Sequence, residues 1–552
     1  MMNGNVPPPI DTTAIRVPER QTRERWITLL VFGLTCAYLF LFRRYTTLDP
    51  DEGIILQGAQ RILQGEVLYR DFFSFVTPGS YYFHAFLFKI FGSSLTVGRT
   101  ALVFAGGTFS VVTYLLARRV CARGNALMAA ALVTLTCLPY RFLVLHNWDS
   151  TLGACLALYC AVRWLESPSF TWTLGAGSFT SLTFLFEQSK GAGLALGLGL
   201  GLLAVTRLNR PNSLWTRATL AGLAAGLGWP LLVVLTYFGA HHSLAPMLAD
   251  WYWPLQHYSA VNVVPYGYQN WSDSGRQALF GSGSWGVRLL AVLAVSPTFL
   301  ISVLPLVAAA LLPYWAVKMW RQRSLRAKCA YYVLVSATLS GLLLSVVMVR
   351  ADIVHFMYLE PLFALVLAWV VDGRDIPGRI FTRVRPFLNA FVAISFLLMS
   401  MALLLRSVNA PTQVETRRGV ITMPRKDTVI EYVQAHVAPG EKILVYPYLP
   451  LYYYLTETCS PTRYEFFQPG MNTAQQSREI ISQVASQRIR VVLFEASFTD
   501  KIPTSWPGTP LKAIANDPVA DYILETYRTC RVLKSPRNWR FVFMVRKDLA
   551  CP

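Results

Sequence analysis

An acidic cluster at residues 48–53 is the part of the sequence best suited to chemistry. Asp49, Pro50, Asp51 and Glu52 directly follow the first membrane-length apolar stretch. Carboxylates held where a helix leaves the membrane can remove a proton from a hydroxyl beside a lipid-bound substrate. Helix capping is the structural alternative, because Asp49 can cap a helix that begins at Pro50 and has Glu52 at its third position. Capping leaves Asp51 unexplained, so Asp51 is the first candidate for proton transfer.

The composition places the chain among membrane proteins. Of its 552 residues, 54% are hydrophobic, 13% aromatic and only 14% charged, and the mean hydropathy is +0.39. Such a chain is too apolar to be a soluble globular protein. The net charge of +20 would suggest nucleic acid for a soluble chain, but the basic residues fall largely in short loops between apolar stretches. We therefore expect membrane lipids, and no nucleic acid, as partners.

The apolar stretches predict the membrane topology. A window of about 20 residues gives about eleven helical spans. They lie near residues 26–43, 97–117, 124–142, 150–165, 170–187, 191–206, 217–239, 287–315, 329–349, 353–371 and 387–405. Arg and Lys cluster in alternate connections, so the positive-inside rule places these connections and an N-terminal tail, residues 1–25, in the cytoplasm. We expect a multi-pass protein of the inner cell membrane.

The sequence changes character after the last span. Residues 406–552 contain no membrane-length apolar stretch and alternate β-rich segments with helical ones, which predicts a small α/β domain. An odd number of spans places this domain on the outer, periplasmic face. That compartment permits a disulfide, and we expect Cys459 to pair with Cys530, because Cys551 lies one residue from the chain end. The predicted fold class is a multi-spanning α-helical membrane domain, residues 26–405, with a C-terminal α/β domain outside.

Two connections on the predicted outer side are rich in aromatic residues. The first outer loop, residues 45–95, carries Asp71 among aromatic side chains, and the outer loop 240–286 carries Trp253 and Tyr258. Flat aromatic faces suit a sugar or a prenyl chain, and anchoring at the membrane interface explains them equally well. Trp253 and Tyr258 are therefore candidates for substrate binding.

Basic side chains at the outer junctions are candidates for binding a phosphate group. They are Lys190, Arg350 and His355, with Arg70 and Arg141 behind them. Cations near the interface suit a phosphate at the membrane surface, while snorkelling explains Lys190 and Arg350 equally well. Asp352 could orient His355 or pair with Arg350. Asp149, at another outer junction, is a further candidate for substrate binding.

These features resemble those of the GT-C membrane glycosyltransferases. The first span, the acidic pair that opens an interfacial helix, a later acid at Asp71 and the outer basic residues are similar to the branch related to protein O-mannosyltransferases and lipid A aminoarabinose transferase. The resemblance covers residues 26–405 and implies that Asp51 is the catalytic base and that Asp71 is a second catalytic acid. After Asp71, two phenylalanines stand where relatives carry a Lys-Pro-Pro-like element, so the donor contacts of that element are not transferred.

The resemblance implies inverting transfer of a hexose or pentose from a polyprenyl-phosphate carrier to a hydroxyl of a glycan, lipid or protein at the outer face. Asp51 would remove the hydroxyl proton while cations stabilise the departing phosphate. Glu52 would assist, bind a divalent cation through its oxygens, or only complete the helix cap. No other cofactor is expected.

Two alternatives belong to other classes of protein. A transporter or flippase for a lipid-linked sugar would also bury charges in a bundle, but it should show internal repeats and interrupted spans. A non-catalytic envelope assembly protein would explain the outer domain but not the acidic first loop.

Overall fold

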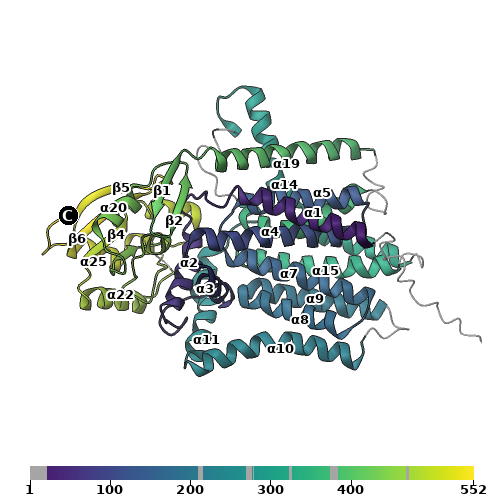
Figure 1. The fold of residues 1–552 in the computed structure, drawn as a ribbon, viewed down its shortest axis with the longest axis horizontal. Helices are drawn as coiled ribbons and strands as arrows, with labels where there is room; N and C mark the ends of the chain where they lie inside the picture. The colour runs from purple at the N-terminus through teal and green to yellow at the C-terminus, as the bar shows by residue number, and fades with distance from the viewer. Residues whose placement is uncertain are drawn as a thin grey trace, which may run out of the picture.

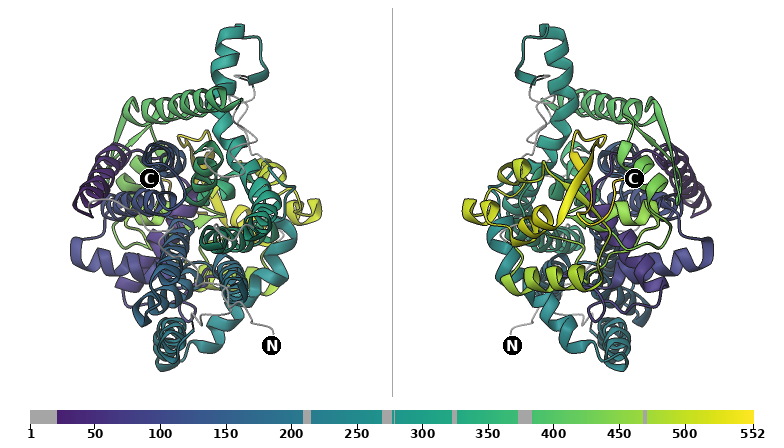
Figure 2. Two further views of the ribbon diagram at one scale, coloured as in Figure 1. Left: turned by 90° about the vertical axis from the view of Figure 1, so that its right-hand side faces the viewer. Right: turned by 90° about the vertical axis from the view of Figure 1, so that its left-hand side faces the viewer.

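The structure is a computed structural model that describes residues 21–208, 215–268, 277, 279–321, 326–372, 383–467 and 471–552. Most of the predicted N-terminal tail, residues 1–25, and part of the loop 240–286 lie outside the described residues. Long helices run side by side in a bundle, and a smaller part that contains a sheet sits at one end of it (Figure 1). Seen from that end, the sheet lies across the ends of the bundle helices (Figure 2).

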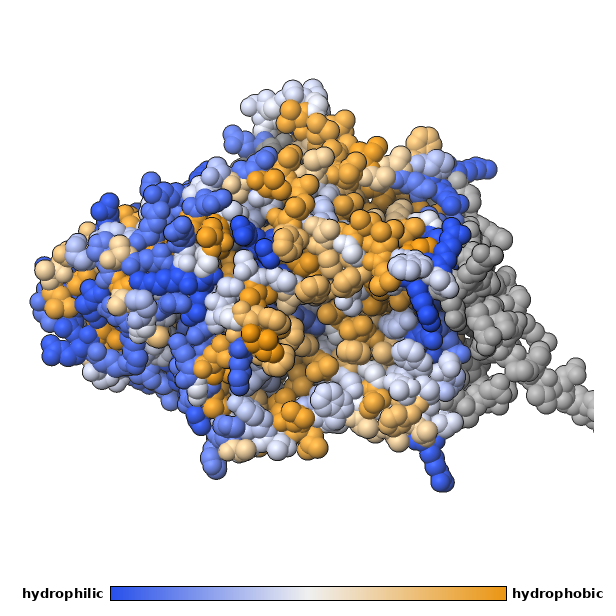
Figure 3. Space-filling view, in the orientation of Figure 1, coloured by the Kyte–Doolittle hydropathy of each residue, from blue (hydrophilic) through white to orange (hydrophobic). Residues whose placement is uncertain are grey.

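Each predicted span falls on helical residues. The bundle helices are α1 (Gln21–Phe40), α4 (Leu95–Ala117), α5 (Arg123–Leu132), η2 (Val133–Cys137), α6 (Leu138–Tyr140), α7 (His146–Glu166), α8 (Phe170–Phe186), α9 (Gln188–Leu208), α10 (Arg217–Ala240), α14 (Trp285–Arg321), α15 (Arg326–Val349), α16 (Ile353–Tyr358), α17 (Glu360–Asp372) and α19 (Arg385–Val408). Of the described helices, 6 are long and apolar enough to cross a membrane, namely α4, α9, α10, α14, α15 and α19. On the face in Figure 3, apolar side chains cover the bundle and hydrophilic ones cover the sheet-containing end.

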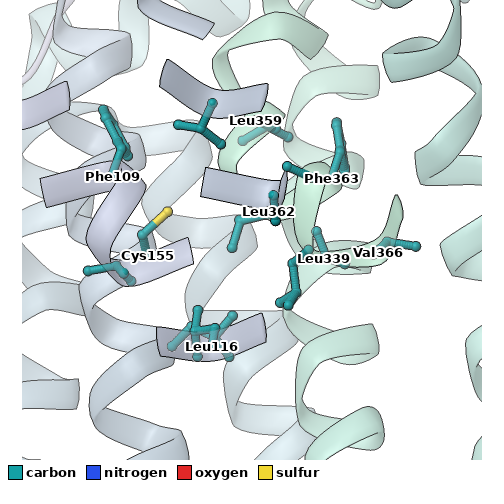
Figure 4. Packing of buried hydrophobic residues seen from close by; sticks show 14 of the residues in the cluster. Phe109, Leu116, Cys155, Leu339, Leu359, Leu362, Phe363 and Val366 are labelled. Atoms are coloured by element: carbon teal, nitrogen blue, oxygen red, sulfur yellow. The ribbon is translucent and has the colours of Figure 1, made fainter. Parts of the chain in front are cut away.

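Helix α17 forms the centre of the bundle. All 13 of its residues are buried, as expected for a helix that is apolar on every side and surrounded by other helices. Its side chains Leu362, Phe363 and Val366 belong to one apolar cluster with Phe109 of α4 and Leu339 of α15 (Figure 4). This close-packed centre gives the elements at the end of the bundle a rigid base.

Short helices lie between the bundle and the sheet. They are α2 (Pro50–Leu63), α3 (Gly79–Phe91), α11 (Leu244–Trp253), η3 (Pro254–Tyr258) and α12 (Ser259–Asn262). The predicted cap of α2 is confirmed, because Asp49 accepts a hydrogen bond from the backbone N–H of Asp51 at 3.2 Å and Pro50 occupies the first helical position. The cap fixes where α2 begins and hence where Asp51 points.

The C-terminal part contains the predicted small sheet. Its strands β3 (Leu444–Tyr446), β4 (Val491–Glu495), β5 (Tyr527–Lys534) and β6 (Arg540–Arg546) lie in the order β3-β4-β6-β5. β3 and β4 are parallel, and the other neighbours are antiparallel. The accompanying helices are α20 (Thr428–His436), α21 (Leu451–Thr456), α22 (Ala474–Ser486), η5 (Thr499–Lys501), α23 (Ile502–Ser505), α24 (Leu511–Ala515) and α25 (Pro518–Thr526).

A separate hairpin joins this part to the first outer loop. Strands β1 (Thr412–Thr416) and β2 (Gly419–Met423) form the hairpin. Thr422 of β2 donates its N–H to the carbonyl of Arg44 at 2.8 Å, and its own carbonyl accepts from the N–H of Thr46 at 2.9 Å. The residues just before the acidic cluster therefore pair with the hairpin as an added extended segment.

The predicted disulfide between Cys459 and Cys530 is wrong. Cys530 pairs with Cys551, with a Cα–Cα distance of 5.6 Å, and Cys459 is a free thiol. Cys459 forms a backbone β-bridge with Lys442, which lies just before β3 at one edge of the sheet. Cys530 lies in β5, at the opposite edge. The chain end returns along β5 after β6, so Cys551, not Cys459, comes within reach of Cys530.

Candidate functional site

A cavity of about 1290 Å³ lies where the bundle, the first outer loop and the C-terminal part meet. Its charged and histidine lining residues are Asp49, Asp51, Arg141, His146, Glu187, Lys190, Arg350, Asp352, His355, Arg406, Lys501 and Arg537. This lining has four carboxylates and six Lys or Arg side chains, an excess of positive charge that suits an anionic group. Of the predicted site residues, Asp51, Lys190, Arg350, His355, Asp352 and Tyr258 line the cavity.

Asp49 and Asp51 share one arginine. Arg141, which follows α6, approaches Asp49 Oδ1 at 2.8 Å and Asp51 Oδ2 at 2.7 Å through its Nη2. Arg537 also donates to Asp49, at 2.7 Å, and the hydroxyl of Tyr448 donates to Asp51 Oδ1. The Asp49 side chain is only 8% exposed, whereas that of Asp51 is 42% exposed. Asp51 is thus the carboxylate of the two that a bound molecule can reach.

Asp49 is held in its ionised form. Burial alone would raise its pKa, but the positive charges of Arg141 and Arg537 outweigh burial and lower the pKa to about 2. The same carboxylate accepts the N–H of Asp51 at the start of α2. Asp49 therefore serves as a fixed anion that orients Arg141 and the helix start.

Lys190, near the start of α9, is almost fully enclosed. Its ammonium group lies 2.8 Å from Glu187 Oε2, 2.9 Å from the hydroxyl of Ser150 and 3.0 Å from the carbonyl of Asn147, and its side chain is 1% exposed. Protein acceptors thus account for all three of its N–H donors. Lys190 therefore contributes positive charge to the cavity wall, but its N–H groups already donate to protein acceptors.

Arg350, Asp352 and His355 form one connected group at the start of α16. Arg350 Nε donates to Asp352 Oδ2 at 2.5 Å, and its Nη1 donates to Asn262 Oδ1 at 3.0 Å. Asp352 Oδ1 accepts the backbone N–H of His355 at 2.9 Å and lies 2.6 Å from His355 Nδ1. Asp352 thus both pairs with Arg350 and orients His355. This fixes the partly exposed imidazole at the cavity wall.

Comparisons with known proteins bear on the fold of the chain. Residues 76–231 match the sequence family described as dolichyl-phosphate-mannose-protein mannosyltransferase. The chain is similar to the crystal structure of ArnT from Cupriavidus metallidurans in the apo state, with a TM-score of 0.54 and 13% identity over 96% of this chain and 100% of that one. It is also similar to ArnT of the same organism bound to undecaprenyl phosphate, with a TM-score of 0.50 and 12% identity over 97% of this chain and 100% of that one.

This protein has the GT-C membrane glycosyltransferase fold. A weaker similarity is to the oligosaccharyltransferase AglB from Archaeoglobus fulgidus, with a TM-score of 0.46 and 12% identity over 96% of this chain and 75% of that one. No curated protein sequence matches the chain. The resemblance inferred from the acidic first loop is confirmed at the level of the fold.

Four predicted site residues do not line the cavity of this GT-C protein. Glu52 is fully buried against Arg99, Asp71 accepts hydrogen bonds from the N–H of Val67 and from Arg70, Asp149 accepts one from Ser80, and the Trp253 ring stacks on Phe75. The cavity lining contains none of the four.

The environment of Glu52 does not suit a metal ion. Arg99 donates to its two oxygens at 2.8 and 2.6 Å, and the N–H of Val144 adds a third hydrogen bond at 3.0 Å. A divalent cation would have to displace the guanidinium group. Among the described residues, no group of three or more His, Cys, Asp or Glu side chains is arranged to hold a metal.

The C-terminal part of the GT-C protein supplies cavity residues that the sequence did not indicate. They include Tyr448, Lys501, Trp506, Arg537 and Trp539. Lys501 pairs with Glu495 and lies 3.8 Å from the centre of the Trp539 ring; burial lowers its pKa to about 8. No motif marks these residues, because their place in the cavity depends on how the sheet docks on the bundle.

Proposed function

We propose that this GT-C protein transfers a sugar from a polyprenyl-phosphate carrier to a hydroxyl acceptor at the outer face of the membrane. The observation that carries the proposal is the setting of Asp51. This carboxylate is accessible, fixed by two donors and placed in a cavity whose lining has an excess of cations. ArnT, which has the same fold, has been solved bound to undecaprenyl phosphate, and the matching sequence family is described by a dolichyl-phosphate sugar.

The transfer step follows from these groups. Asp51 accepts the proton of the acceptor hydroxyl as the oxygen attacks the anomeric carbon. A new C–O bond forms on the face opposite the carrier, and the bond from the anomeric carbon to the phosphate oxygen breaks with its electron pair on the phosphate. The sugar is thereby inverted, and the polyprenyl phosphate leaves. Asp51 keeps the proton until water removes it.

The cations of the cavity stabilise the phosphate as negative charge builds on its leaving oxygen. Arg350 and His355 are held in place by Asp352, so they need little reorganisation during the reaction. Lys190 acts through its charge from within the wall, because its protons already have acceptors. The volume of about 1290 Å³ exceeds that of ordinary small-molecule sites and suits a sugar phosphate together with part of its lipid and an acceptor.

The orientation in the membrane is part of the proposal. Residues 26–405 would form the transferase domain and residues 406–552 a periplasmic domain, because basic residues cluster in the connections that alternate with the cavity side. Exposed serines on the two sides allow a test. An impermeant thiol reagent on intact cells should label Ser482→Cys and not Ser167→Cys, and the reverse pattern would overturn the orientation.

The function is tested with purified protein, a set of polyprenyl-phosphate sugars and a mixture of envelope acceptors. Asp51→Asn should lower transfer by about two to four orders of magnitude, with normal insertion in the membrane. Asp71→Asn is the matched control, because it makes the same change in the same loop but outside the cavity. Equal losses for the two variants would contradict the assignment of Asp51. Retained anomeric configuration in the product would contradict direct displacement.

A further inference from the structure

The structure assigns a positioning role to Tyr448 of the C-terminal part. We propose that its hydroxyl group holds Asp51 in the orientation needed to accept a proton, so that the bundle alone does not make a complete active site. The inference rests on the proposed function of Asp51. Tyr448 donates to Asp51 Oδ1, while Arg141 donates to Oδ2 at 2.7 Å. Two donors on different oxygens fix the rotation of a carboxylate and leave each oxygen a further lone pair.

The Tyr448 ring is itself held in place. It is 5% exposed, and it packs edge-on against Phe466 at 4.5 Å between ring centres and against Phe498 and Trp506 at 6.2 Å each. These three rings come from separate segments of the C-terminal part. Aromatic contacts of this kind restrict the ring, so the hydroxyl group cannot follow Asp51 if the carboxylate turns away. Tyr448 therefore stays in place and can hold the partly exposed side chain of Asp51.

Backbone contacts on either side of the pair set the distance between them. Two residues after Asp51, Gly53 of α2 lies so close to α21 that a Cβ there would be 2.2 Å from the backbone nitrogen of Leu451. Before Asp51, the backbone of Arg44 and Thr46 pairs with Thr422 of β2. The acidic segment is thus docked on the C-terminal part both before and after Asp51. Such docking on both sides is what a side chain needs to be held to a fraction of an ångström.

The charged and titratable groups around Asp51 define what Tyr448 adds. They are Arg141 and Asp49, Arg537 through Asp49, His146 of α7, Tyr258 of η3 and Tyr358 of α16. Arg141 stays in place when Tyr448 is replaced, so the charge balance changes little. A loss of transfer in Tyr448→Phe would therefore report the orientation of Asp51 rather than a change in the charge around it.

Tyr448→Phe tests the role, with Tyr452→Phe as its control. Each variant loses a tyrosine hydroxyl of the C-terminal part that donates to an aspartate. The partner of Tyr448 is Asp51 in the cavity, whereas the partner of Tyr452 is Asp427, which does not line the cavity. We expect kcat of Tyr448→Phe to fall about ten- to a hundredfold, with the donor KM within about twofold of wild type. Tyr452→Phe should keep the wild-type kcat. A Tyr448→Phe enzyme with the wild-type kcat would overturn the proposal.

A second measurement does not need activity. The melting temperatures of wild type, Asp51→Ala, Tyr448→Phe and the double variant form a double-mutant cycle. If the hydroxyl holds the carboxylate, the second substitution should shift the melting temperature less than it does alone. If no lipid-linked sugar is transferred by wild type but the pair couples, the proposed function fails and the contact stands. Additive shifts would overturn the positioning role whatever the activity.

Discussion

Arg99→Met should show how much a buried ion pair beside the site contributes to the stability of the protein. Arg99 of α4 and Glu52 of α2 are both 0% exposed, and Arg99 also donates to the carbonyl of Tyr45. Removing the guanidinium group leaves the Glu52 carboxylate buried, with the N–H of Val144 as its one remaining donor among the described residues. Breaking a buried pair by removing one partner lowers stability by about 3–5 kcal/mol. The variant should still insert in the membrane but unfold more readily.

Glu52→Gln should change the stability in opposite directions in wild type and in Arg99→Met. Glu52→Gln in wild type leaves Arg99 unpaired and should also lower stability by about 3–5 kcal/mol. In Arg99→Met, the same change removes the stranded charge while the amide oxygen can still accept the N–H of Val144. It should therefore restore most of the loss. About 1–3 kcal/mol should remain lost, because the carbonyl of Tyr45 has lost its donor.

Denaturant unfolding of the detergent-purified variants, followed by tryptophan fluorescence, measures these differences. Arg70→Met is the control, because the side chains of Arg70 and Asp71 are 45% and 31% exposed and water screens such a pair, so its loss should change the stability little. The reasoning is refuted if Glu52→Gln lowers stability equally in both backgrounds. A normally stable Glu52→Gln protein with strongly reduced transfer would instead restore a catalytic role for Glu52.

Three further outcomes are expected. Gly53→Ala should push α21 away from α2 and lower stability by about 1–3 kcal/mol or more, whereas Gly33→Ala in α1, where no atom lies within 4 Å of the new Cβ, should not; equal melting temperatures for the two would contradict the contact. A non-reducing peptide map should link Cys530 to Cys551 and show Cys459 as a free thiol; a link between Cys459 and either of them would contradict the structure. Asp49 has a pKa lowered from 3.8 to about 2, so it should contribute about 2 kcal/mol that is present above pH 4 and is lost as the pH falls to about 2. Asp49→Asn should show a smaller loss over that interval in pH-dependent melting, and an identical loss would refute this contribution of Asp49.

The helices and the start of α2 could be predicted from the sequence because their signals are local. Apolar stretches of membrane length mark the bundle helices, and Asp49 followed by Pro50 marks the cap that the structure contains. Asp51, Arg350 and His355 line one cavity, and all three come from junctions that were predicted on the same, outer side of the membrane.

The partners of these residues could not be predicted, because they lie far along the chain. Tyr448 is 397 residues from Asp51, and Arg537 is 488 residues from Asp49. Nothing in the sequence near a lone tyrosine or arginine tells which carboxylate it will meet. The same limit explains the wrong disulfide, since the order of strands in the sheet decides which cysteines are neighbours. Glu52 looked like half of an acidic pair because its partner Arg99 belongs to another helix.

The contacts between the acidic segment and the C-terminal part have a consequence for biosynthesis. The segment with Asp49 and Asp51 is translated near the beginning, whereas Tyr448 and Arg537 come from the last fifth of the chain. The ribosome must therefore make nearly the whole polypeptide before the carboxylates meet their distant donors. A nascent chain, or one cut short by a premature stop codon, would carry the acidic segment in the membrane without an assembled site. If the proposed function holds, a chain that is still being translated would therefore lack a complete site for transfer.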